Sequence, residues 1–219
     1  MNYKKRCENE HLMGHKRGCS PHRRGPSSFS LHDPVLIFGE LKLKEGDLFL
    51  DLGCGVGDYS LQAAKIIGVS GVVYALDIQE NLLDGLAEEA ASQGLNNIRT
   101  RVSNIDSPLA IGDGCIDVAF IATVLHLFNL NEDGKILFNE IRRVLKPEGR
   151  LAIIECKKED LPFGPPIHLR HSPEELEAAV TPYGFERLSY VDLGCNYMIQ
   201  FKIKLNARFS SRRLLPRKV

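Results

Sequence analysis

From residue 48 onward, short runs of β-forming apolar residues alternate with longer segments in which apolar residues recur every three to four positions. This alternation is typical of strands that are connected by helices in a mostly parallel sheet. We expect strands over residues 48–53, 71–78, 98–103, 116–122 and 150–155. Their spacing predicts an α/β fold with a doubly wound sheet.

Amphipathic segments between these strands predict helices over residues 58–67, 80–93 and 132–145. Each segment is followed closely by a helix-stopping glycine or proline. A further helix is expected to begin at Ser172, because Ser172 and Glu175 have the spacing of a capping box. Residues 32–43 predict a short helix with one apolar face that enters the domain.

The pattern changes after Gly184, where two β-rich runs, 186–193 and 197–205, are separated by only three residues. A connection this short cannot form a parallel crossover, so the two runs predict an antiparallel hairpin. With the five strands before it, the hairpin completes a seven-stranded sheet that is mostly parallel and ends in an antiparallel pair.

Three regions follow from these patterns. Residues 1–30 are rich in Gly, Pro, Ser, His and Arg and predict a flexible arm. Residues 31–205 form the predicted domain, and residues 206–219 form a basic tail. The overall composition, 43% hydrophobic and 26% charged residues in a chain of 219, suits one globular domain.

Composition also limits the location of the protein. No apolar run approaches the ~20 residues of a membrane-spanning helix, and the polar N-terminus lacks the apolar core of a secretory signal. We therefore expect a cytoplasmic protein without a membrane partner. Six scattered cysteines are then expected to be free thiols or ligands and not disulfides.

Charge is distributed unevenly although the formal net charge is zero. Residues 1–25 carry +5 and residues 202–219 carry +7, which leaves −12 for the segment between them. Two interpretations stay open: the basic ends rest in solvent against the acidic domain, or they recruit an anionic substrate or nucleic acid.

The most informative stretch is a glycine-rich turn directly after the first strand. Asp51 is followed by Gly53, Gly55 and Gly57 in a G-x-G-x-G pattern that opens a helix. Glycines permit positive φ angles and a close approach of the backbone to a ligand. The second strand ends at Asp77, where a carboxylate can accept hydrogen bonds from both hydroxyls of a ribose.

The spacing of the turn argues against a dinucleotide. NAD and FAD sites use G-x-G-x-x-G, which presents a helix N-terminus to a pyrophosphate. Here Asp58 and Tyr59 stand near the position of the last glycine. An Asp51 carboxylate would repel a pyrophosphate but attract an α-ammonium group, so the ligand should be a cationic nucleoside.

The segment from Asp51 to Gly57 resembles motif I of the class I S-adenosylmethionine (SAM) dependent methyltransferases, and Asp77 matches the acid of motif II. Residues 140–151 resemble the E-x-x-R-V-L-K-P-G-G segment of the branch that contains ubiquinone and menaquinone C-methyltransferases and arsenite methyltransferases. The resemblance covers roughly residues 30–205. It implies a Rossmann-like fold and an enzyme that transfers the methyl group of SAM.

The resemblance also implies a set of cofactor-binding residues. The glycines should line the methionine part of SAM, the acid of motif II should hold the ribose, and residues after the third strand should meet the adenine. The complete predicted set is Asp51, Gly53, Cys54, Gly55, Gly57, Asp77, Ile78, Asn104, Ile105, Asp106 and Thr123.

Methyl transfer from a sulfonium needs mainly an aligned, water-free acceptor, and a base helps if the acceptor is a hydroxyl or an acidic carbon. His126, just after the fourth strand, is the candidate base; the alternative is a purely structural hydrogen bond. Cys156, His168 and Arg170 follow the fifth strand and are predicted to line the acceptor pocket. A small-molecule acceptor is favoured, because the chain has a single compact domain and no added recognition module. Amino-group methyltransferases that act on adenine or glutamine usually carry an Asn/Asp-Pro-Pro-aromatic motif after the fourth strand, and its absence here argues against such nitrogen acceptors.

Two alternative functions remain at this point. The N-terminal Cys7, His11, His15 and Cys19 recur every four residues and form a weak candidate for a metal or metalloid site. Together with cysteines near the pocket, they keep an arsenite or thiol methyltransferase open. The other alternative is a SAM-binding protein that the basic ends recruit to nucleic acid.

Overall fold

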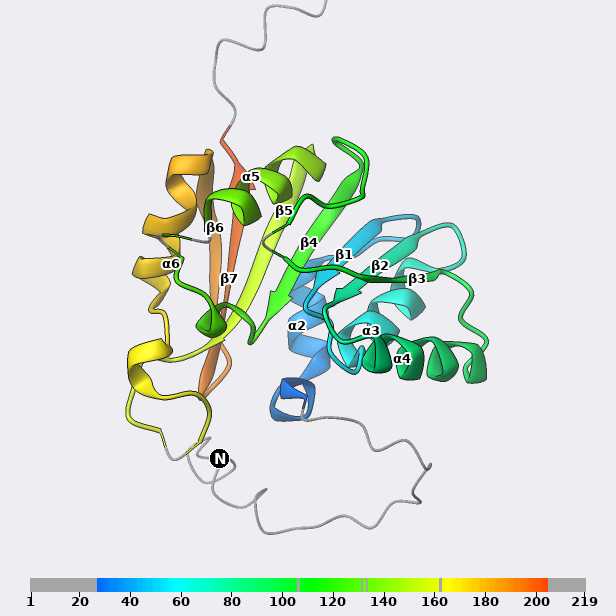
Figure 1. Cartoon of the computed structure of the whole chain (residues 1–219), viewed down its shortest axis with the longest axis horizontal. Coiled ribbons are helices and arrows are strands. Elements are labelled where there is room, and N and C mark those ends of the chain that lie inside the picture. Colours follow the sequence, from blue (N-terminus) through cyan, green and yellow to red (C-terminus); the bar gives the residue numbers. More distant parts are fainter. Residues whose placement is uncertain (1–26, 106, 131, 133, 162, 205–219) are drawn as a thin grey trace, which may run out of the picture.

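The computed structural model describes residues 27–105, 107–130, 132, 134–161 and 163–204. Its centre is a seven-stranded sheet in the order β3-β2-β1-β4-β5-β7-β6 (Figure 1). The strands are β1 (Leu48–Leu52), β2 (Val72–Asp77), β3 (Ile98–Val102), β4 (Ile116–Ala122), β5 (Leu145–Cys156), β6 (Phe185–Asp192) and β7 (Asn196–Ile203). The predicted fold class is confirmed.

The directions of the strands bring the carboxyl ends of four of them together at one edge of the sheet. β1 pairs in parallel with both β2 and β4, and β4 pairs in parallel with β5. β7 is antiparallel to β5 and to β6, as the hairpin pattern predicts. The carboxyl ends of β2, β1, β4 and β5 therefore lie next to one another, around the point between β1 and β4 where the winding direction reverses.

The helices match the amphipathic segments closely. They are α2 (Pro34–Leu41), α3 (Asp58–Ile67), α4 (Glu80–Ser92), α5 (Gly134–Val144) and α6 (Pro173–Val180), with short 3-10 turns η1 (Ser28–Leu31), η2 (Leu125–Leu127), η3 (Ile167–Leu169) and η4 (Thr181–Tyr183). The predicted capping box of Ser172 and Glu175 is present at the start of α6. None of the helices in the described ranges is long and apolar enough to cross a membrane.

One boundary differs from the prediction. β5 begins at Leu145, whereas the sequence indicates a strand from residue 150. Leu145 pairs with Ile116 before the register shifts, so the strand passes through Pro147 and Gly149 without ending. Those two residues are typical of a turn, and the bulge that accommodates them depends on pairing with β4.

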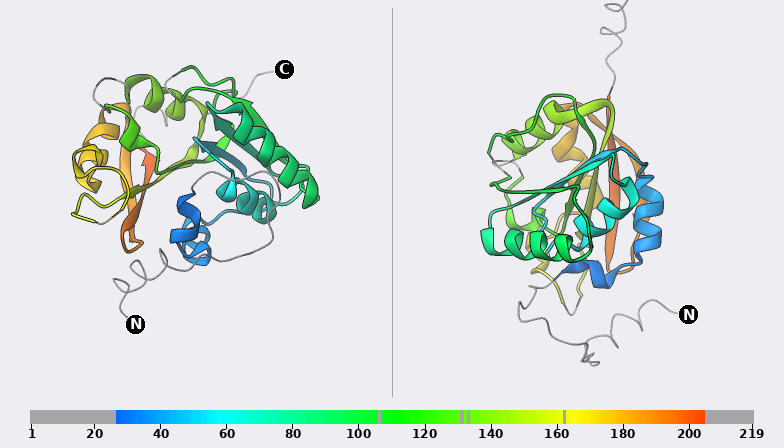
Figure 2. Two further views of the ribbon diagram at one scale, coloured as in Figure 1. Left: turned by 60° about the horizontal axis from the view of Figure 1, so that its bottom comes forward. Right: turned by 90° about the vertical axis from the view of Figure 1, so that its right-hand side faces the viewer.

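The core has two halves, one on each face of the sheet. One cluster gathers the apolar side of α5 and α6 around fully buried residues of β4, β5 and β7. The other packs α2 and α3, with Leu86 and Ala90 of α4, against the opposite face. Figure 2 shows the sheet from two further sides, with α2 and α5 on opposite faces.

The packed part of the chain begins before residue 31. Phe29 of η1 makes an edge-to-face contact with Tyr59 of α3, with ring centroids 5.0 Å apart. Ser27 caps η1 and Asp33 caps α2, each through a side-chain oxygen that accepts a backbone N–H. The last residues of the predicted arm therefore belong to the folded body, while residues 1–26 lie outside the described part.

The E-x-x-R-V-L-K-P-type segment performs a structural task. The Arg143 guanidinium donates to both carboxylate oxygens of Glu140 and to the carbonyls of Leu109 and Ile111. Glu140 in turn accepts the N–H of Leu109 at 2.7 Å. This pair attaches α5 to the segment between β3 and β4, and it lowers the pKa of Glu140 through the Arg143 hydrogen bond.

We expect Arg143→Met to lower the free energy of unfolding by about 2 kcal/mol, since it leaves carbonyls and a carboxylate without their donor. Urea denaturation followed by circular dichroism measures the change. Arg99→Met is the matched control, because Arg99 is exposed and its bonds within the described ranges go to the neighbouring carbonyls of Asn96 and Ile98. Equal losses in the two variants would contradict this role of Arg143.

Candidate functional site

The glycine-rich turn is anchored to the second strand. The N–H groups of Gly53 and Cys54 both donate to the carbonyl of Leu76, at 2.8 and 2.9 Å. Gly57 then closes the turn by donating to Cys54 O at 2.9 Å and caps α3 with φ +80°. The turn is therefore held in one conformation before any ligand binds.

The glycines of the turn are required for different reasons. A Cβ atom on Gly57 would lie 2.3 Å from Leu86 Cδ1, so Gly57 permits the packing of α4. Gly55, at φ +53°, has nothing within 4 Å of the position of a Cβ atom. Open space at a glycine in this conformation fits a backbone that a ligand approaches closely.

Asp77 closes the site on the β2 side. Its Oδ2 accepts the N–H of Gly55 at 2.8 Å, and its Oδ1 accepts the N–H of Gln79 at 2.9 Å. Both bonds fix the direction of a carboxylate that is only 8% exposed. The next residue, Ile78, is 65% exposed, which places an apolar surface beside the buried acid.

Asp51 is a buried acid at the base of the turn. Its Oδ2 accepts the Ser60 hydroxyl at 2.6 Å, and its residue exposure is 2%. Burial raises the pKa of Asp51 to about 7, while the Ser60 hydrogen bond acts in the opposite direction and the nearby Asp77 charge adds to the rise. A cationic group bound there would be favoured by the ionised form.

The residues after β3 that were predicted to meet the adenine lie in different environments in the structure. Asn104 is exposed, whereas Ile105 is 4% exposed and packs in the apolar cluster beneath β1 and β4. Asp106 lies outside the described residues. Thr123, at the end of β4, has a φ of +54°, a conformation that costs energy for a residue with a branched Cβ.

His126 lies at the same edge and faces a buried acid. Its Nδ1 is 3.4 Å from Oε2 of Glu155, the penultimate residue of β5. Glu155 is fully buried and is fixed by the N–H of Leu125, which donates to Oε1 at 2.7 Å. Glu155 was not among the predicted site residues, although an acid at the end of a strand is the same signal that identifies Asp77.

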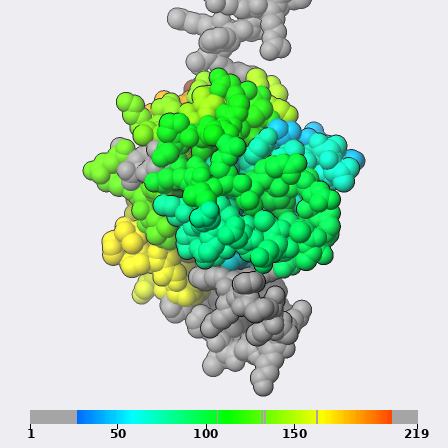
Figure 3. Space-filling view, turned by 45° about the vertical axis from the view of Figure 1, so that its right-hand side comes forward, coloured from blue at the N-terminus to red at the C-terminus, as the bar shows by residue number. Residues whose placement is uncertain are grey.

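One predicted contact in the segment after β5, residues 157–171, is wrong. Arg170 was expected to face an anionic acceptor, but it is 4% exposed and four of its N–H groups donate to backbone carbonyls of its own loop. The loop carbonyls bury the guanidinium and give it a structural role. Cys156 is buried beneath this loop, which reaches the surface as the yellow segment of Figure 3.

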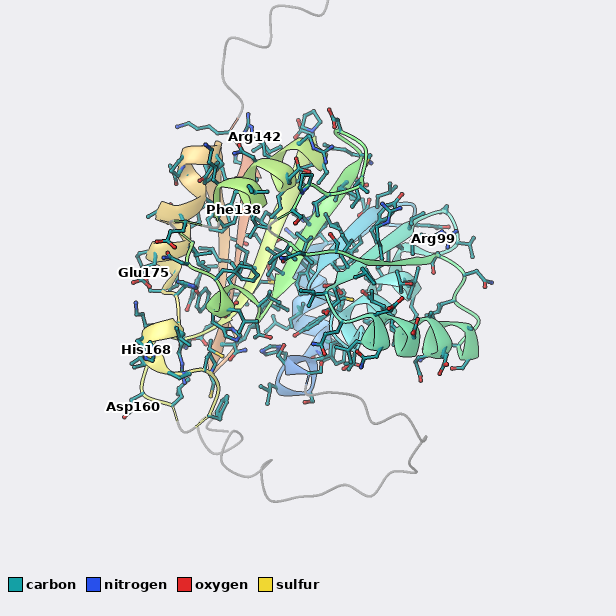
Figure 4. The ribbon with its side chains drawn as sticks, in the orientation of Figure 1. Arg99, Phe138, Arg142, Asp160, His168 and Glu175 are labelled. Atoms are coloured by element: carbon teal, nitrogen blue, oxygen red, sulfur yellow. The ribbon has the colours of Figure 1, made fainter. Side chains whose placement is uncertain are left out.

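His168 is exposed on the outer part of this loop, as Figure 4 shows. The neighbouring His171 points inward instead: its Nε2 lies 3.1 Å from Leu125 O, and its own carbonyl accepts the Tyr197 hydroxyl at 2.7 Å. His171 therefore links the loop to η2, the turn that contains His126.

A cavity of about 420 Å³ lies between this loop, α6 and the hairpin. Its cations already have partners, since Lys157 pairs with Asp192 and Lys158 with Glu175. The cavity shares no lining residue with the glycine turn, Asp77 or His126. We therefore place the site at the carboxyl edge of β1, β2 and β4 and not in this cavity.

The described cysteines do not form a soft metal site. Cys54, Cys115 and Cys156 are free thiols. Burial raises the pKa of the Cys54 and Cys156 thiols, which disfavours the thiolate that a metal or metalloid needs. No cluster of three His, Cys, Asp or Glu ligands occurs in the described ranges; Cys7, His11, His15 and Cys19 lie outside them.

A family model described as a methyltransferase domain matches residues 43–200. The chain belongs to this methyltransferase family. A SAM-dependent methyltransferase from Aquifex aeolicus, solved by crystallography, is 31% identical with a TM-score of 0.73, and the match covers 82% of this chain and 94% of that one. These similarities confirm the predicted membership of the class I SAM-dependent methyltransferases.

Curated relatives include a demethylmenaquinone methyltransferase of Lactobacillus johnsonii, 34% identical over 58% of this chain and 51% of the relative. A 2-phytyl-1,4-naphtoquinone methyltransferase of Trichormus variabilis is 35% identical over 51% of this chain and 48% of the relative. The chain spans about half the length of these curated relatives.

The residues at this edge fit the SAM that the family implies. Open space above Gly55 admits the ligand, and the fixed Asp77 carboxylate keeps lone pairs for hydroxyl donors. Exposed Ile78 offers an apolar surface to a flat ring.

We expect the raised pKa of Asp51 to make the free energy of unfolding depend on pH. The unfolded carboxyl titrates near its usual value of about 4, so between that pH and about 7 folding takes up a proton. The stability that this proton provides is complete at low pH and is lost as pH rises through about 7. Asp51→Asn should remove that dependence.

Urea denaturation of both proteins between pH 5 and 8 tests this expectation. Ser60→Ala removes the hydrogen bond that lowers the pKa of Asp51. In this variant the pH-dependent loss of stability should therefore continue to a higher pH than in the wild type. Parallel pH profiles for the wild type and Asp51→Asn would show that Asp51 is ionised throughout.

Proposed function

We propose that this chain transfers the methyl group of SAM to the ring of a small, quinol-type acceptor, with His126 as general base. The observation that carries the proposal is the pairing of His126 with the buried Glu155, at the sheet edge that also carries the glycine turn. The printed names of the Lactobacillus and Trichormus relatives supply the acceptor class.

Binding of SAM is assigned residue by residue as part of this proposal. The Asp77 carboxylate holds the ribose hydroxyls, Ile78 packs on the adenine and Asn104 borders it. The backbone at Gly55 lies under the methionine part, and Asp51 attracts its ammonium. Gly53, Cys54 and Gly57 shape the turn, and Thr123 lies at the end of β4 beside the methyl group.

Glu155 determines which nitrogen of His126 is available. A carboxylate that faces Nδ1 favours the hydrogen on that nitrogen, which leaves Nε2 as a proton acceptor. The same carboxylate faces the ring while it carries the accepted proton. Because the Leu125 N–H holds Glu155 from the other side, the imidazole is oriented before the acceptor binds.

When bound, SAM would supply a methyl group on a sulfonium sulfur, which would leave with the electron pair of the carbon–sulfur bond as a neutral thioether. His126 Nε2 would take the proton of the acceptor hydroxyl, and a ring carbon of the resulting phenolate would form the new bond to the methyl carbon. The methylated ring carbon would then release its own proton to solvent. His126 would return its proton to the oxygen, which restores the aromatic ring, the hydroxyl and the neutral base.

The base role predicts a loss of rate without a loss of cofactor binding. His126→Gln and Glu155→Gln should each lower kcat with a reduced naphthoquinone acceptor by about 10²–10⁴-fold, the usual contribution of a general base. Affinity for S-adenosylhomocysteine, measured by calorimetry, should stay within about twofold of the wild type, because the two side chains bond to each other and to Leu125.

Asp84→Asn is the control, since Asp84 is exposed on α4 and its conversion to the amide should leave kcat unchanged. Rates are measured with tritiated SAM, and a fraction of small molecules from cell extract serves as a second acceptor source. Full activity in His126→Gln would overturn the base assignment. Methylation of protein or RNA in place of small molecules would overturn the acceptor class.

A further inference from the structure

A hydrogen-bonded chain connects the N-terminal segment to the end of β4. The Thr123 hydroxyl donates to Ser28 Oγ at 3.2 Å, and Ser28 Oγ lies 3.4 Å from the Tyr59 hydroxyl. The Tyr59 hydroxyl lies 2.7 Å from Nδ1 of His32. Four polar side chains thus meet at one place: they come from η1, from its C-cap, from α3 and from the residue after β4. Ser28 and Thr123 are 95 residues apart in sequence.

One direction along this chain gives every hydroxyl one acceptor: Thr123 donates to Ser28, Ser28 to Tyr59, and Tyr59 to Nδ1 of His32. Burial raises the pKa of Tyr59 far above its usual value, so the phenol keeps its proton. Burial also lowers the pKa of His32 to about 4, so the imidazole is neutral near pH 7. A phenol that donates to Nδ1 leaves the single hydrogen of the neutral ring on Nε2.

Nε2 of His32 is buried and has no hydrogen-bond partner among the described residues. A buried N–H without an acceptor costs about 1–3 kcal/mol, and such groups are rare in native structures. The cost is explained if an oxygen atom of a ligand completes the bond.

The surroundings indicate which oxygen. Tyr59, which holds His32, is the second residue of α3, whose N-cap Gly57 provides no side-chain cap. The first turn of a helix favours anions, because its N–H groups point outward and its dipole is positive there. The strained φ of Thr123 lies at the other end of the same hydrogen-bonded chain, and strain of this kind is concentrated at ligand sites.

We propose that Nε2 of His32 donates a hydrogen bond to the α-carboxylate of the methionine part of SAM, with Tyr59 and Ser28 holding the ring in the donor tautomer. The proposal rests on the cofactor part of the proposed function and is independent of the acceptor. It separates the two charged ends of the amino acid: Asp51 attracts the ammonium, and His32 with the α3 N-terminus receives the carboxylate.

Calorimetry with two ligands tests the contact. S-adenosylhomocysteine carries the carboxylate, whereas 5′-methylthioadenosine has the same nucleoside and thioether without the amino acid. His32→Phe should weaken binding of S-adenosylhomocysteine by about tenfold, the usual loss for one hydrogen bond to a charged group. Binding of 5′-methylthioadenosine should stay within about twofold of the wild type.

Two further variants test the N–H donor and the tautomer separately. His32→Gln retains an N–H donor of similar reach and should recover most of the affinity. Tyr59→Phe removes the hydroxyl that sets the tautomer and should mimic His32→Phe. Nitrogen NMR of the wild type should report the Nε2–H tautomer in the free protein and a shift of Nε2 when S-adenosylhomocysteine binds.

Equal weakening of both ligands in His32→Phe would show that His32 only supports the fold, and unchanged affinity for both would show that it makes no contact. Either result overturns the proposal. Because no acceptor is present, a failure to methylate quinols leaves this test unaffected, and the two proposals fail separately.

Discussion

The contact between the Asp77 carboxylate and the N–H of Gly55 is the interaction on which the site depends. It joins the end of β2 to the middle of the glycine turn at 2.8 Å, while Leu76 O receives two further N–H groups of the same turn. The turn would otherwise be free to adopt several backbone conformations, since three of its residues are glycines. One acid thus shapes the backbone cradle and keeps lone pairs for a ribose.

The order of the strands then sets where the other groups of the candidate site lie along one edge of the sheet. β2 ends in the Asp77 carboxylate, the glycine turn follows β1, and the ends of β4 and β5 bring His126 and Glu155 together. The opposite end of the sheet carries structural bonds such as Lys146 to Asp117. This division explains why the E-x-x-R-V-L-K-P-type segment identifies the family while lying away from the chemistry: Glu140 and Arg143 fix the segment between β3 and β4.

The fold could be predicted almost completely from the sequence, because strand runs, amphipathic helices and their stop residues are local patterns. Asp51, Gly55 and Asp77 were also predictable, since each stands at the carboxyl end of a strand or in the turn after it. Arg170 was misjudged because its burial depends on carbonyls that the loop folds around it. His32, Ser28 and Tyr59 carry no motif, and only the packing of η1 on α3 brings them together.

The central claim is that the turn and Asp77 are shaped for a sulfonium nucleoside, and calorimetric titration with S-adenosylhomocysteine tests it most directly. Asp77→Asn keeps the size of the side chain and an oxygen for Gly55 but loses the charge that accepts two hydroxyls. We expect at least about a tenfold loss of affinity in this variant and no change in Asp84→Ala, an exposed acid of α4. Equal affinity in Asp77→Asn and the wild type, or a preference of the wild type for NADH, would contradict the account.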